Sequence, residues 1–75
     1  MSDTAREILL NVYKAYVRSE DYTVNTPVSS QIHAFNMAVN EIKEYIEFIR
    51  RDMFKVSMTL TELGLEYCME NFGEE

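Results

Sequence analysis

Cysteine, histidine and glycine are scarce in this 75-residue sequence, and tryptophan is absent. The single cysteine, Cys68, excludes an internal disulfide framework and a multi-cysteine metal site. Because Gly64 and Gly73 are the only glycines, the chain has no glycine-rich loop that could bind phosphate groups. The single histidine, His33, forms no nucleophile–base pair at a recognisable spacing. We therefore expect a protein that is not an enzyme and has no cofactor and no metal site.

Long hydrophobic runs are also lacking, so no segment is expected to span a bilayer. The first residues contain no hydrophobic signal-peptide segment, and no helix pairs an apolar face with a basic one, as membrane-surface helices do. These absences predict a cytoplasmic protein without a membrane partner. The length allows one domain, over residues 1–75. A chain this short buries only about 60–65% of its unfolded surface, so we expect a homodimer to stabilise it.

Charge is unevenly distributed along the chain, whose formal net charge is -6. Residues 22–40 carry no charge other than what His33 acquires, whereas residues 56–75 hold five glutamates and no base. Between these segments lies a short basic stretch that contains Arg50, Arg51 and Lys55 against one acid, Asp52. An anionic partner is therefore expected to approach the neutral and basic segments and to avoid the C-terminal end.

Apolar residues at helical spacing predict a first helix over residues 3–19 and a second over about 30–44. Side chains that can cap the two helices occur in residues 2–4 and in the segment Val28-Ser29-Ser30. Residues 22–26 are β-prone and precede Pro27, so they form either a short strand or an ordered loop. The apolar side of the second helix is expected to consist of Ile32, Phe35, Val39 and Ile42.

Two interpretations compete for the following segment. The apolar repeat of the second helix continues through Ile46, Ile49 and Met53, which favours one long helix. Residues 54–60, in contrast, alternate strictly between apolar and polar, which is typical of a half-buried strand. A strand needs a hydrogen-bonded neighbour, so we favour a β-hairpin of residues 45–49 and 54–60. The apolar positions of the second strand are Phe54, Val56, Met58 and Leu60.

A last helix is predicted over residues 62–72, capped by Thr61 and followed by a frayed end at 73–75. Its glutamates, Glu62, Glu66 and Glu70, lie four residues apart on one side. The fold class is therefore α+β, in the order helix, short extended segment, helix, β-hairpin and C-terminal helix. The apolar face of the last helix comprises Leu63, Leu65, Tyr67, Cys68, Met69 and Phe72.

Two stretches carry a resemblance to a known family. Residues 38–46, which end in Tyr45-Ile46, and residues 59–67, which contain Leu60-Thr61-Glu62-Leu63-Gly64, resemble small winged-helix proteins of bacteria and phages. In that family a recognition helix runs into a wing strand, and a Leu-Thr-x-x-Gly pattern opens the C-terminal helix. The resemblance covers about residues 30–72. It implies a winged-helix-like fold, with a dimer surface on the first and last helices.

One departure from the family pattern concerns residues 20–29. They contain Pro27 and no periodic apolar face, so the short helix that precedes the recognition helix in the family is expected to be shortened or missing.

The resemblance suggests a DNA-binding transcription regulator, with residues 30–44 as the recognition helix and the hairpin as the wing. Asn and Gln side chains can bind adenine edges, and basic side chains can hold phosphate groups. Each of these residues is equally compatible with an ordinary solvated surface. The candidate DNA-binding residues are Ser30, Gln31, His33, Asn36, Asn40, Lys43, Arg50, Arg51 and Lys55.

The alternative is a protein–protein interaction module that uses this fold without binding DNA, such as a phage or prophage accessory factor or inhibitor. The acidic balance, the glutamate stripe of the last helix and the five methionines favour it. A solvated helix face and an ordinary core explain the same residues.

Overall fold

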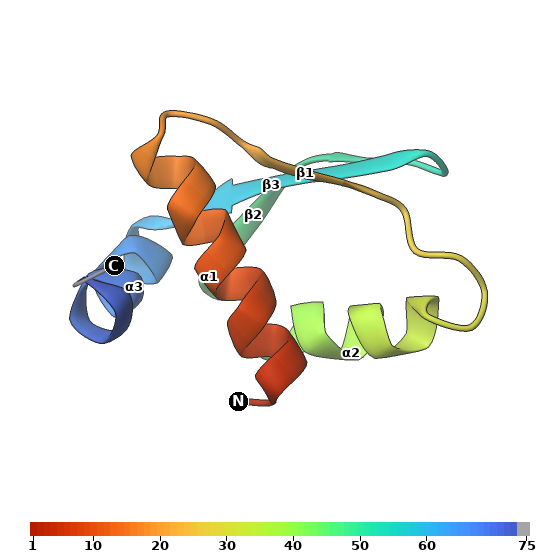
Figure 1. Cartoon of the computed structure of the whole chain (residues 1–75), viewed down its shortest axis with the longest axis horizontal. Coiled ribbons are helices and arrows are strands. Elements are labelled where there is room, and N and C mark those ends of the chain that lie inside the picture. The colour runs from red at the N-terminus through yellow and green to blue at the C-terminus, as the bar shows by residue number, and fades with distance from the viewer. Residues whose placement is uncertain (74–75) are drawn as a thin grey trace.

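The computed structural model describes residues 1–73, which form three helices and one antiparallel sheet (Figure 1). Glu74 and Glu75, part of the expected frayed end, lie outside the described residues. The predicted α+β class is confirmed, and the arrangement is compatible with a winged-helix-like fold. The elements are α1 (Asp3–Val17), β1 (Tyr22–Asn25), α2 (Ile32–Glu41), β2 (Ile46–Arg51), β3 (Lys55–Leu60) and α3 (Glu62–Phe72).

Helix α1 begins where the sequence predicted and ends two residues earlier. The hydroxyl of Ser2 accepts a hydrogen bond from the backbone N–H of Ala5 at 3.2 Å, which caps the first turn. Ser19 adopts a φ of 60°, in the left-handed region, and the N–H of Glu20 turns back to the carbonyl of Ala15 at 2.9 Å. This reversal terminates the helix at Val17, two residues before the predicted end at residue 19.

The sheet has the strand order β1-β3-β2, so β3 is the central strand. Residues 22–25 form a strand rather than a loop, because they pair with residues 55–58 of β3. No helix occurs between α1 and α2 in the described chain, which confirms that the short helix of the family pattern is missing. Val56, Met58 and Leu60 are buried on the sheet face that packs against the helices. On the opposite face, the hydroxyls of Ser57 and Thr23 share a hydrogen bond of 2.9 Å.

The hairpin is confirmed over the long helix, although α2 is shorter than the predicted span of 30–44. Ser30 lies in a turn and does not cap the helix; Gln31 occupies the N-cap position without a side-chain hydrogen bond. The backbone instead begins to turn at Val28, whose carbonyl accepts the N–H groups of Gln31 and Ile32. At the other end, residues 42–45 form a turn that leads directly into β2.

The core lies where α1, α2 and α3 meet one face of the sheet. Helix α3 has its predicted bounds but buries only Gly64, Cys68 and Phe72, which recur every four residues. The prediction of a broad apolar face was therefore wrong for Leu63 and Met69, which are exposed. The buried core residues are Ala5, Ile8, Leu9, Val12, Tyr13, Ala38, Val39, Ile42, Ile46, Val56, Met58, Leu60, Cys68 and Phe72.

Phe54 was also assigned wrongly to the core. It lies in the turn that joins β2 to β3, beyond the reach of the covering helices, and is 72% exposed.

The hairpin tip, the 26–31 segment and the first turn of α2 all lie at one end of the 35 Å long axis (Figure 1). Helix α3, which carries three of the glutamates, lies at the opposite end.

Candidate nucleic-acid interface

All nine candidate residues are exposed, and most of them lie at the end of the molecule that contains the hairpin tip (Figure 1). Ser30, Gln31 and His33 lie in the turn before α2 and in its first helical turn. Arg50 and Arg51 end β2, and Lys55 begins β3. The hairpin tip and the start of α2 thus lie at the same end of the molecule.

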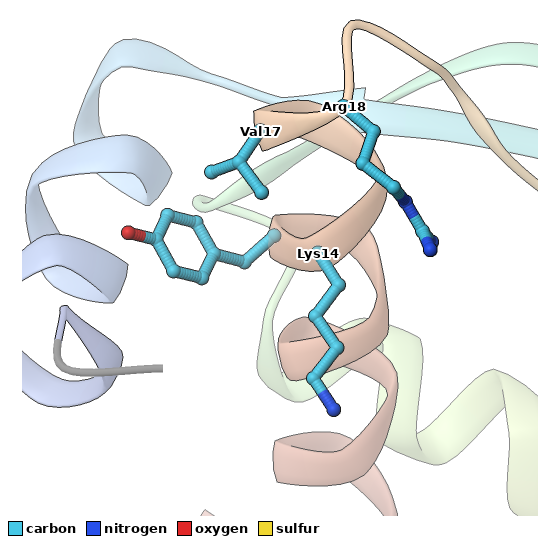
Figure 2. A pocket seen from close by; sticks show the side chains of 4 residues that line it. Lys14, Val17 and Arg18 are labelled. Atoms are coloured by element: carbon cyan, nitrogen blue, oxygen red, sulfur yellow. The ribbon is translucent and has the colours of Figure 1, made fainter.

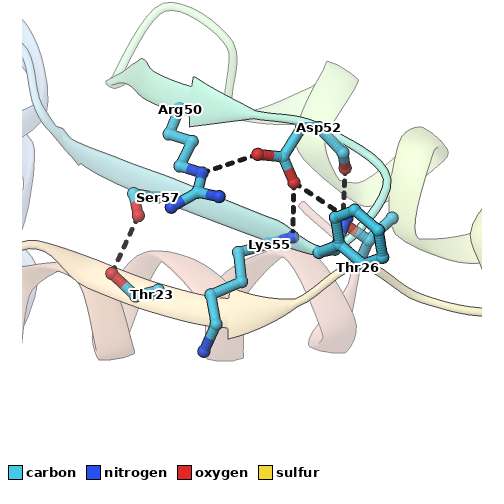
Figure 3. A network of polar contacts seen from close by, with 7 residues as sticks. Thr23, Thr26, Arg50, Asp52, Lys55 and Ser57 are labelled. Carbon is cyan, nitrogen blue, oxygen red and sulfur yellow. Dashed lines mark hydrogen bonds and ion pairs between the residues drawn. The ribbon is translucent and has the colours of Figure 1, made fainter.

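Asp52 organises the hairpin tip. One of its carboxylate oxygens, Oδ1, accepts the backbone N–H groups of Lys55 and Phe54, each at 2.8 Å, as Figure 3 shows. The other oxygen, Oδ2, pairs with Nε of Arg50 at 2.6 Å. The bond from the Lys55 N–H, together with those from Arg50 and Phe54, lowers the pKa of Asp52 to about 2. The carboxylate is therefore charged at neutral pH and committed to contacts within the turn.

Thr26 braces this turn from the segment that follows β1. Its hydroxyl donates to the carbonyl of Asp52 at 2.7 Å, and its N–H donates to the carbonyl of Phe54 at 3.0 Å. Figure 3 shows Thr26 beside Asp52. Two sequence-distant segments are thus joined at the tip, so the turn is fixed by more than its own local hydrogen bonds.

A β-bulge determines which arginine faces α2. Phe48 pairs with Met58 and Arg50 pairs with Ser57, so Ile49 is an extra residue in β2. The bulge shifts the alternation of side chains by one residue. Arg51 consequently pairs with Val56 and shares its sheet face, which is the face on which the helices pack.

Arg51 connects the hairpin to α2. Its Nη2 donates to Oδ1 of Asn36 at 2.5 Å, and its guanidinium lies 4.8 Å from the centre of the Phe48 ring. This contact joins two of the predicted residues, Asn36 and Arg51. Because the partner is a neutral amide, this contact brings no negative charge to Arg51.

The three basic side chains of the hairpin differ in whether an acidic side chain pairs with them. Arg50 is paired with Asp52, whereas neither Arg51 nor Lys55 forms an ion pair within residues 1–73. The side chain of Lys55 extends away from Asp52 (Figure 3). Arg51 and Lys55 therefore supply the available positive charge of the tip.

Asn40 and Lys43 are not grouped with the tip. They lie at and beyond the C-terminal end of α2, a helix of 10 residues and therefore about 15 Å in length. The neighbouring Glu41 binds α1: Ser2 donates its hydroxyl to Oε2 at 2.7 Å and its N–H to Oε1 at 3.0 Å. The hydrogen bond from the Ser2 hydroxyl lowers the pKa of Glu41, so an acid stays charged near Lys43.

Sequence reasoning missed the exposed apolar residues of this end. Met53 is 82% exposed and Phe54 is 72% exposed, and both belong to the tip. Met53, in the expected turn, and Phe54, at the expected start of the following strand, come directly after Asp52, and this pair of large apolar residues was the available signal. Val28, Met37 and Ile49, in the neighbouring segments, are exposed as well.

Two hollows lie elsewhere on the described surface. The first lies on the last turns of α1, where Lys14, Val17 and Arg18 project around it, as Figure 2 shows, and Tyr13 completes its lining. The second hollow is lined by Tyr45, Leu63, Glu66, Tyr67 and Glu70.

No group of three His, Cys, Asp or Glu side chains within residues 1–73 is placed to hold a metal ion. In the same residues, no helix is both long and apolar enough to cross a membrane.

Comparison with known proteins gives no relative: no protein-family description, curated protein or solved structure matches the chain significantly.

Proposed function

We propose that the chain is a small winged-helix-like DNA-binding protein, a non-enzymatic regulator that acts in the cytoplasm as a homodimer. The hydrogen bond between Arg51 and Asn36 carries the proposal, because it joins the basic hairpin to the polar side of α2. A duplex that contacts one of these elements can therefore contact the other.

The two elements have different roles in this proposal. Arg51 and Lys55 hold phosphate groups, which position the protein without reading sequence. Gln31 and His33 lie at the exposed start of α2, where they can reach base edges. Asn36 uses its carbonyl oxygen on Arg51, so it serves first to position that arginine. Lys43 adds a more distant phosphate contact at the other end of α2.

The glutamates of α3 contribute little repulsion at this interface. The glutamates of α3 and the hairpin tip lie at opposite ends of a 35 Å axis (Figure 1). The Debye length is about 8 Å at physiological ionic strength, so the repulsion of α3 is largely screened at the tip.

A titration of duplex DNA at 50 mM and 200 mM salt tests the proposal. If a dimer contacts about six phosphates, the affinity falls roughly a thousandfold between the two conditions. Arg51→Ala and Lys55→Ala should each weaken binding, whereas Arg6→Ala, which removes an exposed basic side chain of α1, should not. Absence of binding at 50 mM salt, or an equal effect of the three variants, contradicts the proposal.

Charge supports a dimer surface on α1 and α3. The hollow on α1 is flanked by Lys14 and Arg18, and the hollow on α3 by Glu66 and Glu70. In a reciprocal contact each basic hollow meets the partner's acidic one. Sedimentation tests this arrangement: Lys14→Glu and Glu70→Lys should each weaken the dimer, and their combination should restore it. A monomer at high concentration refutes it.

A second candidate function, binding to another protein without DNA, is favoured by α3. Its exposed Leu63 lies in a hollow with the stacked rings of Tyr45 and Tyr67, whose centres are 4.7 Å apart. Glu66 and Glu70 make this hollow suitable for a basic, apolar segment. A short peptide of alternating lysine and leucine should then shift the NMR signals of α3. If it shifts none of them, this candidate fails.

A further inference from the structure

The hairpin tip exposes its largest apolar side chains, and nothing in residues 1–73 covers them. Met53 and Phe54 are more exposed than any other large hydrophobic residue of the described chain. Exposed apolar groups that lie together commonly mark a binding site, whereas scattered ones do not. The exposed Ile49 of the adjoining bulge and the exposed Val28 of the neighbouring segment add to the apolar surface of this end.

The tip is held rigidly. Phe54 donates its N–H to the carboxylate of Asp52, and its carbonyl accepts the N–H of Thr26. Both polar groups of the Phe54 backbone are therefore satisfied inside the turn, and the side chain is what the tip presents to a ligand. A preorganised apolar group loses little conformational entropy on binding, which distinguishes this tip from a flexible loop.

Positive charge surrounds the apolar tip. Arg50, Arg51 and Lys55 flank Met53 and Phe54, and the nearby acid, Asp52, is occupied by three hydrogen bonds. An apolar projection flanked by cations is complementary to duplex DNA, in which phosphate rows border stacked, apolar base faces. A hydrophobic groove on a protein would bury the two apolar side chains but would leave the basic side chains around them without partners.

We propose that Met53 and Phe54 form a wedge that enters the minor groove, partly separates two stacked base pairs and bends the duplex. This inference rests on the proposed DNA binding and adds an activity to it, the deformation of DNA. Side chains such as Phe and Met act in this way in architectural proteins, with bends of about 20–90°. The wedge favours flexible pyrimidine–purine steps, because these unstack at the lowest cost.

The test measures bending and unstacking directly. A duplex of about 30 base pairs carries a fluorophore at each end and 2-aminopurine beside a central TA step. Binding of the wild-type protein should shorten the end-to-end distance and raise the 2-aminopurine fluorescence. The double variant Met53→Ala, Phe54→Ala should bind about tenfold more weakly, with an unchanged salt dependence and without either signal.

A matched control removes an exposed methionine at the other end of the molecule, by Met69→Ala, and should leave both signals intact. Unchanged urea unfolding of all variants confirms that they are folded. Salt-dependent binding without bending or unstacking overturns the wedge and leaves DNA binding in place. Bending by the double variant also overturns it, because the duplex is then deformed without these two side chains. No binding of DNA by the wild type overturns both proposals.

Discussion

Gly64, in the first turn of α3, lies directly against the backbone carbonyl of Tyr45, in the turn before β2. A Cβ at position 64 would overlap that carbonyl group. The same carbonyl oxygen accepts the N–H of Thr61 at 3.0 Å, and the Thr61 hydroxyl accepts the N–H of Gly64 at 3.0 Å. The close approach therefore belongs to the junction that attaches α3 to the sheet.

Gly64→Ala should destabilise the protein by about 1–3 kcal/mol, because the added methyl group can be accommodated only if α3 moves away from Tyr45. Urea unfolding measures the change. Glu66→Ala, on the exposed side of the same helix, is the control and should change the free energy of unfolding by less than about 0.5 kcal/mol. If the two variants were equally stable, the tight packing of this junction would be refuted.

Met58 lies at the centre of β3 and is completely buried, whereas Met53 at the tip is almost fully exposed. The same substitution at the two sites should therefore have different results. Met58→Ala should cost about 2–5 kcal/mol through lost burial and an unfilled cavity, and Met53→Ala should cost almost nothing. Thermal and urea unfolding report both values. A stable Met58→Ala protein would mean that β3 is not the centre of the core.

The pKa of Asp52, about 2, lies below its ordinary value of 3.8. Because the folded pKa is depressed, the contribution of this group to stability is fully present above about pH 4 and is lost as the pH falls through 2. NMR titration of the Asp52 carboxyl carbon should give a midpoint near 2 in the folded protein and near the ordinary value in urea. A midpoint near 3.8 in the folded protein would show that the turn lacks these hydrogen bonds.

Cys68 is completely buried in the core, and its burial raises the pKa of the thiol from 9.0 to about 11. The thiolate is the reactive form, so its population at pH 8 is about a hundredfold lower than that of an unperturbed thiol. Ellman's reagent should react at least a hundredfold more slowly with the folded protein than with the protein in urea. Equal rates would place Cys68 at the surface.

The sequence predicts most of this fold because several elements have strong local signals. Val56, Met58 and Leu60 alternate with polar residues, and Thr61 precedes the helix that it caps, so β3 and α3 could be located within about one residue. The sequence leaves residues 22–25 open between strand and loop, since a strand of this length is decided by its partner, which lies thirty or more residues away.

The candidate site was only partly accessible to the same reasoning. The type and exposure of each residue could be inferred, but not which residues meet. The contact between Arg51 and Asn36 depends on the bulge at Ile49, for which no local residue pattern exists. Phe54 continued the alternation of β3 and was therefore placed in the core, although the tip extends beyond the helices that would cover it.

Thr26 and Arg51 provide two independent links between the hairpin and the polypeptide around the start of α2. The spacing between these two elements is therefore set within the folded chain before any ligand arrives. A ligand that contacts both must match that spacing, so selection among ligands begins with their shape and precedes the recognition of any chemical group.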